Sequence, residues 1–167
     1  KCKEHKLIVS FPTGIKTDHS RSQVPFEITK RPIENISNNR NILATEAQRH
    51  PMHDFIDISD GSNGMALFTK GLKEFETKYY DKGKVQCDLT LLRGVSQTFF
   101  VHGDVSLEFE DEPAQCLGKH QFEYSLLLHK GDYLDGDVIA EADVYVTPIV
   151  AAHYGKGRKG RFPAELS

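Results

Sequence analysis

The sequence lacks several features that would place it in a specialised class of protein. It has no tryptophan, only three cysteines among 167 residues, and a formal net charge of -3. Without an excess of positive charge, composition gives no electrostatic reason to expect nucleic acid or an anionic membrane as a partner. No apolar run approaches the roughly 20 residues that a membrane-spanning helix needs. The remaining composition, 38% hydrophobic and 27% charged, is that of an ordinary globular domain.

The three cysteines are widely spaced and odd in number: Cys2, Cys87 and Cys116. This usage argues against a disulfide framework and indicates a reducing compartment, for which we take the bacterial cytoplasm. A catalytic thiol needs a neighbouring base that lowers its pKa, and no such base stands near any of the three in the sequence. We interpret them as structural thiols.

The chain opens on "KCKEHKLIVSFP", without an initiator methionine, and reaches a strand-like run almost at once. We expect it to be a segment of a longer protein. Its length is that of one domain and is enough to bury a core without disulfides. Residues 1–167 are therefore predicted to form a single domain.

Apolar residues alternate with polar ones along most of the chain, which is the pattern of β-strands with one buried face. Turn clusters of Gly, Asn and Asp separate these runs, and Asn63-Gly64 in "DGSNG" is a turn signal favoured where φ must be positive. Residues 12–23 and 32–50 are predicted to be connections. The predicted strands are residues 5–11, 25–30, 53–59, 64–69, 73–80, 85–93, 98–103, 105–110 and 120–129.

Two of these strands carry a clear apolar face. One face of residues 85–93 holds Val85, Cys87, Leu89 and Leu91, and one side of residues 120–129 holds Phe122, Tyr124, Leu126 and Leu128. Only "DGDVIAEADVYV" suggests a helix, with Ile139, Ala142 and Val146 at compatible spacing. The fold class that follows is all-β, an antiparallel β-sandwich with one short helix near the C-terminus.

Histidines offer only weak candidates for a metal site. His50 and His53 are three residues apart, but Pro51 between them disfavours a helix that would place both on one face. His102 and Asp104 form a His-x-Asp pair. Neither pair has a third ligand at a recognisable distance, and a hydrolytic zinc site usually needs three. No metal site is predicted.

Three acids, Asp57, Asp60 and Asp88, are candidates for paired-carboxylate chemistry. A retaining glycosidase needs two carboxyl groups about 5–5.5 Å apart. In a hairpin, however, acids opposite a core-facing stripe normally face solvent, and Asp60 before Gly61 is a turn former. We therefore expect turn and edge roles for Asp57 and Asp60. A serine nucleophile is not indicated, because no Gly-x-Ser-x-Gly motif is present.

Four segments occur in an order that resembles a known family. They are "LIVSFPTGIKTDHSRSQVPFEITKRPI", "HPMHDFIDISDGSNGMALFTKGLKEFE", "DLTLLRGV" and "AQCLGKHQFEYSLLLHKGD". Together they resemble successive strands of the C-terminal β-sandwich region of glycoside hydrolase family 38, the α-mannosidases. The likeness is greater to the bacterial branch, which includes mannosylglycerate hydrolase-like enzymes. It covers roughly residues 5–150.

The resemblance implies a role inside a larger enzyme. Members are multi-domain proteins with an N-terminal α/β barrel, a helical bundle and then β-sandwich domains of the galactose mutarotase-like super-sandwich type. Their barrel region carries a zinc ion, an aspartate nucleophile and a carboxylic acid–base. The family's zinc signature resembles His-x-Asp followed by Trp; with no tryptophan here, residues 102–104 are not that motif. The resemblance thus implies no catalytic residue, metal or cofactor in this chain, which alone would be inactive.

What the resemblance carries over is a supporting role. In the family the large sandwich packs on the barrel, and an arginine near a strand end approaches the sugar cleft. The matching position is Arg93, which closes "DLTLLR" before Gly94. A guanidinium suits contact with sugar hydroxyls, because it stays charged and offers planar donors. The competing interpretation is a strand-end arginine paired with an acid on the sheet surface. The implied partners are the barrel and helical domains of the same polypeptide and an α-mannoside.

Two other functions stay open from the residues alone. A stand-alone sandwich can bind carbohydrate on aromatic platforms; without Trp, the candidates are Tyr79, Tyr80, Phe99 and Phe100. The chain can also be a purely structural or oligomerisation domain, and assembly into a homo-oligomer is compatible with the sequence.

Overall fold

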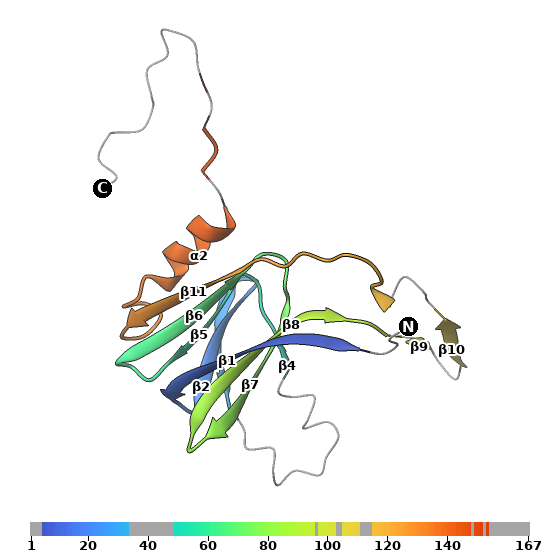
Figure 1. The fold of residues 1–167 in the computed structure, drawn as a ribbon, viewed down its shortest axis with the longest axis horizontal. Coiled ribbons are helices and arrows are strands. Elements are labelled where there is room, and N and C mark those ends of the chain that lie inside the picture. Colours follow the sequence, from blue (N-terminus) through green and yellow to red (C-terminus); the bar gives the residue numbers. More distant parts are fainter. Residues whose placement is uncertain are drawn as a thin grey trace.

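Two antiparallel β-sheets pack against each other, and a short helix covers the outer face of one of them (Figure 1). The computed structural model describes residues 5–33, 49–95, 97–102, 105–110, 115–147, 149–151 and 153, with backbone alone at 97–102 and 105–110. The predicted fold class, an antiparallel β-sandwich with one short C-terminal helix, is confirmed. No helix in these ranges is long and apolar enough to cross a membrane.

The strands form a four-stranded sheet in the order β1-β8-β7-β4, a five-stranded sheet in the order β11-β6-β5-β2-β3, and a separate β9–β10 hairpin. The first sheet contains β1 (Lys6–Lys16), β4 (Arg49–Pro51), β7 (Glu74–Asp81) and β8 (Lys84–Arg93). The second contains β2 (His19–Val24), β3 (Glu27–Pro32), β5 (Phe55–Ser59), β6 (Asn63–Thr69) and β11 (Tyr124–Lys130). The other elements are β9 (Gln97–His102), β10 (Val105–Glu110) and α2 (Val138–Val146).

The main core lies between the two sheets. From β8 it contains Val85, Cys87 and Leu89, all fully buried, with Leu91 packed partly against them. From the other sheet it contains Ile56 on β5 and other apolar side chains of β5 and β6. The predicted apolar face of β8 is therefore confirmed, because alternate side chains of a strand point to opposite faces of the sheet.

The outer face of the five-stranded sheet carries a second apolar cluster under α2. Phe55 of β5 and Phe68 of β6 pack there against Val138 and Ala142 of the helix. Both faces of β5 and β6 are consequently buried. The predicted helix is confirmed, but the buried pair is Val138 and Ala142, whereas Ile139 is 36% exposed.

The predicted connection over residues 12–23 is wrong. β1 continues to Lys16, and β2 begins at His19. β2 buries Ser20 and Ser22 toward the core, so its buried face is polar and small and gives no hydrophobic alternation. Most of the other predicted connection, residues 34–48, lies outside the described residues.

The hairpin turn between β5 and β6 lies within the predicted DGSNG segment, but it is centred on Gly61 and Ser62 instead of on Asn63 and Gly64. Asp60 Oδ1 accepts hydrogen bonds from the backbone N–H groups of Ser62 and Asn63, both at 2.9 Å. The positive φ, +85°, belongs to Gly61, whereas Asn63 and Gly64 are the first residues of β6. The turn role predicted for Asp60 is confirmed, and its carboxyl pKa is lowered by those backbone hydrogen bonds.

Candidate functional site

Arg93 is the last residue of β8, and its side chain is exposed. Its neighbours fix the backbone at this point. Arg93 pairs with Lys6 of β1, the N–H of Gly94 donates to the carbonyl of His5 at 2.7 Å, and the Cys116 thiol donates to the carbonyl of Arg93 at 3.6 Å. Three segments distant in sequence therefore hold the strand end from which the guanidinium projects.

Gly94 is required by the closeness of these segments. A Cβ at this buried position would lie 2.8 Å from Cε1 of His5 and 3.0 Å from the carbonyl oxygen of Gln115. Real Cβ atoms rarely approach neighbours so closely, so a larger residue would displace one of the two segments. The Arg-Gly pair at the end of "DLTLLRG" thus combines an exposed cation with a tightly packed turn.

Glu74, a described acid whose charge is influenced by Arg93, already has other partners. Glu74 on β7 lies 3.1 Å from Nζ of Lys6 and accepts a 2.7 Å hydrogen bond from the hydroxyl of Thr90. Burial tends to raise the Glu74 pKa, but those hydrogen bonds and the charges of Lys6 and Arg93 outweigh it and keep the pKa below its usual value. Across the described residues, no carboxylate lies within 4.0 Å of the Arg93 guanidinium.

The prediction that Asp57 faces solvent is wrong. Asp57 is 1% exposed on the helix-covered face of β5, and its carboxylate accepts a hydrogen bond from Ser59 at 2.9 Å and lies 2.8 Å from Nε2 of His129 on β11. The prediction is wrong because α2 and the segment before it cover the face that a two-stranded hairpin would leave in water. Burial raises the Asp57 pKa despite the hydrogen bonds from Ser59 and His129.

Two glycines admit the imidazole of His129. A Cβ at Gly64 would lie 2.1 Å from its Cε1, and a Cβ at Gly136 would lie 2.4 Å from its Nδ1. The His129 and Asp57 side chains are 3% and 0% exposed. Although the pair has the composition of an acid–base dyad, it is almost completely buried, and a substrate could not reach it. We therefore assign it a structural role, joining the edge strand β11 to β5.

Asp88 is the third acid and lies far from Asp57. It is 2% exposed on the outer face of the four-stranded sheet, because its neighbours Cys87 and Leu89 point into the core. Its carboxylate is held by the ammonium of Lys78 and by the Gln86 amide at 2.7 Å. Asp57 and Asp88 occupy opposite outer faces of the sandwich, so the structure does not bring these acids together as a glycosidase pair.

The candidate metal ligands that the structure describes do not form a cluster. His53 is exposed and lies 2.8 Å from the carboxylate of Asp54, and His50 packs at 5.6 Å from the Phe75 ring. Within the described ranges, no three His, Cys, Asp or Glu side chains are arranged to hold a metal ion. Asp104 and the side chain of His102 lie outside those ranges.

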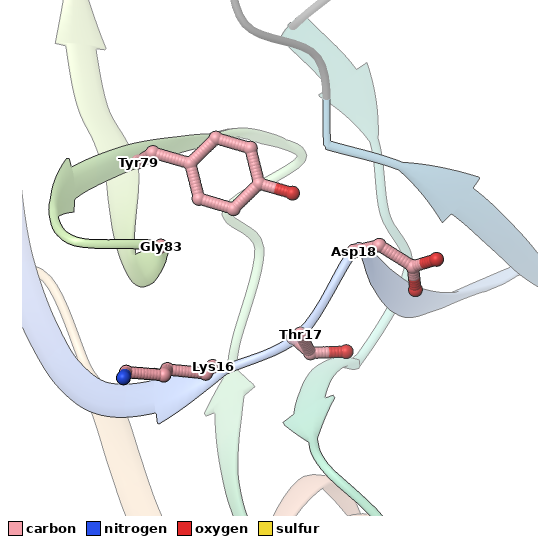
Figure 2. Close-up of a pocket in the computed structure, with 5 residues that line it drawn as sticks. All are labelled: Lys16, Thr17, Asp18, Tyr79 and Gly83. Atoms are coloured by element: carbon pink, nitrogen blue, oxygen red, sulfur yellow. The ribbon is translucent and has the colours of Figure 1, made fainter.

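One open pocket has an aromatic wall (Figure 2). It is lined by Tyr79 and Gly83 from the β7–β8 hairpin, by Lys16 at the end of β1, and by Thr17 and Asp18 from the turn between β1 and β2. The Tyr79 ring reaches across toward that turn, whereas the Lys16 ammonium points away from the ring. Tyr80 is 42% exposed, and the side chains of Phe99 and Phe100 are outside the described set.

Comparison with known proteins identifies the family to which this domain belongs. The model described as "Glycosyl hydrolases family 38 C-terminal domain" matches residues 2–105, more than half of the chain. The chain belongs to glycoside hydrolase family 38. The resemblance that the four sequence segments indicated is thereby confirmed, and Arg93 and Gly94 fall inside the matched region.

A relative is 32% identical over 149 residues: a protein of Halalkalibacterium halodurans named "Putative mannosylglycerate hydrolase". The match covers 89% of this chain and 15% of that protein. Two solved structures from Enterococcus faecalis have similar folds. An alpha-mannosidase from strain V583 gives a TM-score of 0.71 at 25% identity over 95% of this chain, and a family 38 protein gives 0.70 at 27% over 96%.

These three relatives are much longer than this chain, which spans 15%, 16% and 17% of their lengths. Other domains therefore accompany this region in those proteins. The sequence pattern indicated the family and Arg93, but it missed the Asp57–His129 pair. The one local signal for the pair was the placement of Gly64 and Gly136, whose significance depends on where the His129 ring lies.

Proposed function

We propose that this chain is the C-terminal β-sandwich domain of a zinc-dependent retaining α-mannosidase, which supports the catalytic barrel of the same polypeptide. The support is the family 38 match together with the much greater length of the relatives. In this proposal the zinc ion, the nucleophile and the acid–base belong to the barrel, and the substrate is an α-mannoside. The chain by itself then has no hydrolytic activity.

We assign Arg93 to the rim of the sugar cleft, and the carrying observation is its setting. Its backbone is fixed by Gly94, His5 and Cys116, its side chain is exposed, and the adjacent Glu74 is paired with Lys6. A fixed backbone and an exposed guanidinium suit a residue that donates hydrogen bonds to ligand hydroxyls or carboxylates. An arginine used only to pair with the sheet's own acids would more simply contact Glu74.

The test of this role is the Arg93→Ala variant of the full-length enzyme, assayed with an aryl α-mannoside. Loss of a charge-assisted hydrogen bond costs about 1.5–3 kcal/mol, so kcat/KM should fall about 10- to 100-fold. Lys30→Ala is the matched control, because Lys30 is an exposed cation on β3, at the far edge of the other sheet. An unchanged kcat/KM in Arg93→Ala would leave the domain a structural role alone.

The division of labour between domains is tested separately. The purified 167-residue chain should neither hydrolyse the aryl α-mannoside nor retain zinc after gel filtration, whereas the full-length enzyme should do both. Turnover by the purified chain would overturn the proposal, because it would place catalytic groups in this domain.

A carbohydrate-binding module is the second candidate, and the pocket beside Tyr79 is the observation that favours it. An aromatic ring next to hydroxyl and carboxylate groups is a common way to bind a sugar through its apolar face and its hydroxyls. Saturable binding of methyl α-mannoside by the isolated chain, lost in Tyr79→Ala and kept in Tyr80→Ala, would support this function.

A further inference from the structure

The edges of the two sheets differ in how well they are protected. Exposed sheet edges invite pairing with other strands, and proteins block them with proline, charges, bulges or short length. β4 has three residues and ends in Pro51, β3 carries charged residues before Pro32, and β1 contains Pro12 and two register shifts. Three of the four described edges therefore carry such protection.

β11 is the fourth edge, and its apolar stretch has none of these devices. It pairs with β6 in an unbroken register from Tyr124 opposite Thr69 to Lys130 opposite Asn63. Its sequence, YSLLLHK, has no proline, and its charge is confined to the C-terminal end. A regular, apolar edge strand of this kind is a template for a further strand.

One face of β11 points toward the four-stranded sheet, where burial is expected, yet its side chains are exposed. Tyr124 packs edge-on against Phe11 of β1 at 5.6 Å between ring centroids, which places this face of β11 toward the four-stranded sheet. Leu126 and Leu128 alternate with Tyr124 on the same face, yet they are 49% and 78% exposed. β1 lies over β5 and β6, so β11 extends beyond the last strand of the opposing sheet (Figure 1).

We propose that the free edge of β11 is a docking site for a strand from the remainder of the same polypeptide, which extends the five-stranded sheet and shields Leu126 and Leu128. This inference rests on the proposed function insofar as the chain is part of a longer enzyme. The matched relatives are about six times as long as this chain, so chain outside this domain is there to supply the strand. The occupant should carry apolar residues at alternate positions.

Hydrogen exchange of the backbone amides tests the docking directly. In the isolated chain, the β11 amides that face away from β6 should exchange as fast as those of exposed loops. In the full-length enzyme the same amides should exchange at least about 10-fold more slowly. Equal exchange in the two proteins would overturn the proposal, since a strand paired with β11 must engage these amides.

A matched pair of variants tests the apolar contact. Leu126→Lys/Leu128→Lys should leave the Tm of the isolated chain nearly unchanged and lower the Tm of the full-length enzyme by several degrees. The control is Leu134→Lys/Val144→Lys, since these side chains are 61% and 66% exposed and belong to residues outside β11. The control should change neither Tm. A full-length enzyme that tolerates the β11 variant as well as the control would overturn the proposal.

A second copy of the chain is the competing occupant, and light scattering after gel filtration detects it. If the isolated chain dimerises through β11 and the β11 amides of the full-length enzyme remain unprotected, a second copy, and not a strand of the same polypeptide, is the occupant. The outcome is separable from the proposed function. Protection of the β11 amides in a full-length protein without mannosidase activity would support the docking and overturn the proposed function. Mannosidase activity in a full-length protein with unprotected β11 amides would support the function and overturn the docking.

Discussion

At the scale of single residues, burial decides what an ionisable side chain contributes. His53 and His129 each lie 2.8 Å from a carboxylate, but the His53 side chain is 52% exposed and that of His129 is 3% exposed. Water screens the first pair and solvates either member alone. In the second pair, His129 and Asp57 must satisfy each other's hydrogen-bonding groups, because the pair is almost completely shielded from water.

Replacement of His129 by leucine should therefore be costly. It would leave the Asp57 carboxylate buried, with only the Ser59 hydroxyl, among the described side chains, still donating a hydrogen bond to it. Breaking a buried pair costs about 3–5 kcal/mol of unfolding free energy, and we expect the lower end here because Ser59 stays. Urea denaturation measures this. His53→Leu, the matched control, should change stability by less than about 0.5 kcal/mol.

The double variant Asp57→Leu/His129→Leu separates charge from packing. It leaves no charge buried, so it should be more stable than His129→Leu alone, and the two substitutions should not be additive. If His129→Leu and His53→Leu lower the unfolding free energy by the same small amount, burial does not determine how much the Asp57–His129 pair contributes to stability.

At the scale of elements, charged and polar side chains of β7 and β8 form an ion pair and hydrogen bonds around Asp88 on the outer face of their sheet. Burial tends to raise the Asp88 pKa, but hydrogen bonds from Lys78, Ser10 and Gln86 outweigh it and lower the pKa. The folded-state pKa is thus below the unfolded-state value. The resulting stability is present above the unfolded-state pKa and is lost as pH falls through the folded-state pKa.

The Asp88→Asn variant should accordingly show a pH-dependent defect. Near pH 7 it should unfold about 2 kcal/mol more easily than the parent chain, and the difference should shrink as pH drops below about 4. Urea titrations at several pH values measure it. Asp81→Asn is the control, because Asp81 pairs with Lys84 at 3.5 Å but is 48% exposed. A defect that is the same at every pH would attribute the loss to packing.

Elements also show where sequence patterns work. The apolar face of β8 and the helix α2 were predictable, because their side-chain periods of two and of three to four residues are local properties. β2 was missed because it buries Ser20 and Ser22, and its place in the sheet is set by β3 and β5 on either side. The β5–β6 turn falls in the predicted DGSNG segment, but Asn63-Gly64 was the wrong signal within it, because Asp60 accepts the hydrogen bonds that close the turn.

At the scale of the whole molecule, Cys87 reports on the integrity of the core. It is fully buried between the sheets, and burial, together with the nearby charge of Asp88, raises the pKa of its thiol. Only the thiolate reacts with iodoacetamide. Cys87 should therefore be alkylated only through global unfolding, far more slowly than the half-buried Cys116, which mass spectrometry of the labelled peptides can measure. Equal rates would mean that the two sheets separate readily in the native state.

The sequence by itself determined the fold class, the family and the strand that ends in Arg93, because these depend on alternation along single segments and on motifs in order. The tertiary structure alone decided three other properties: Asp57 is sealed by α2 and paired with His129, Glu74 is engaged by Lys6, and the apolar side of β11 lies open. The physical reason is the same in each case. A strand's pattern shows which residues share a face, whereas burial depends on what distant segments place against that face.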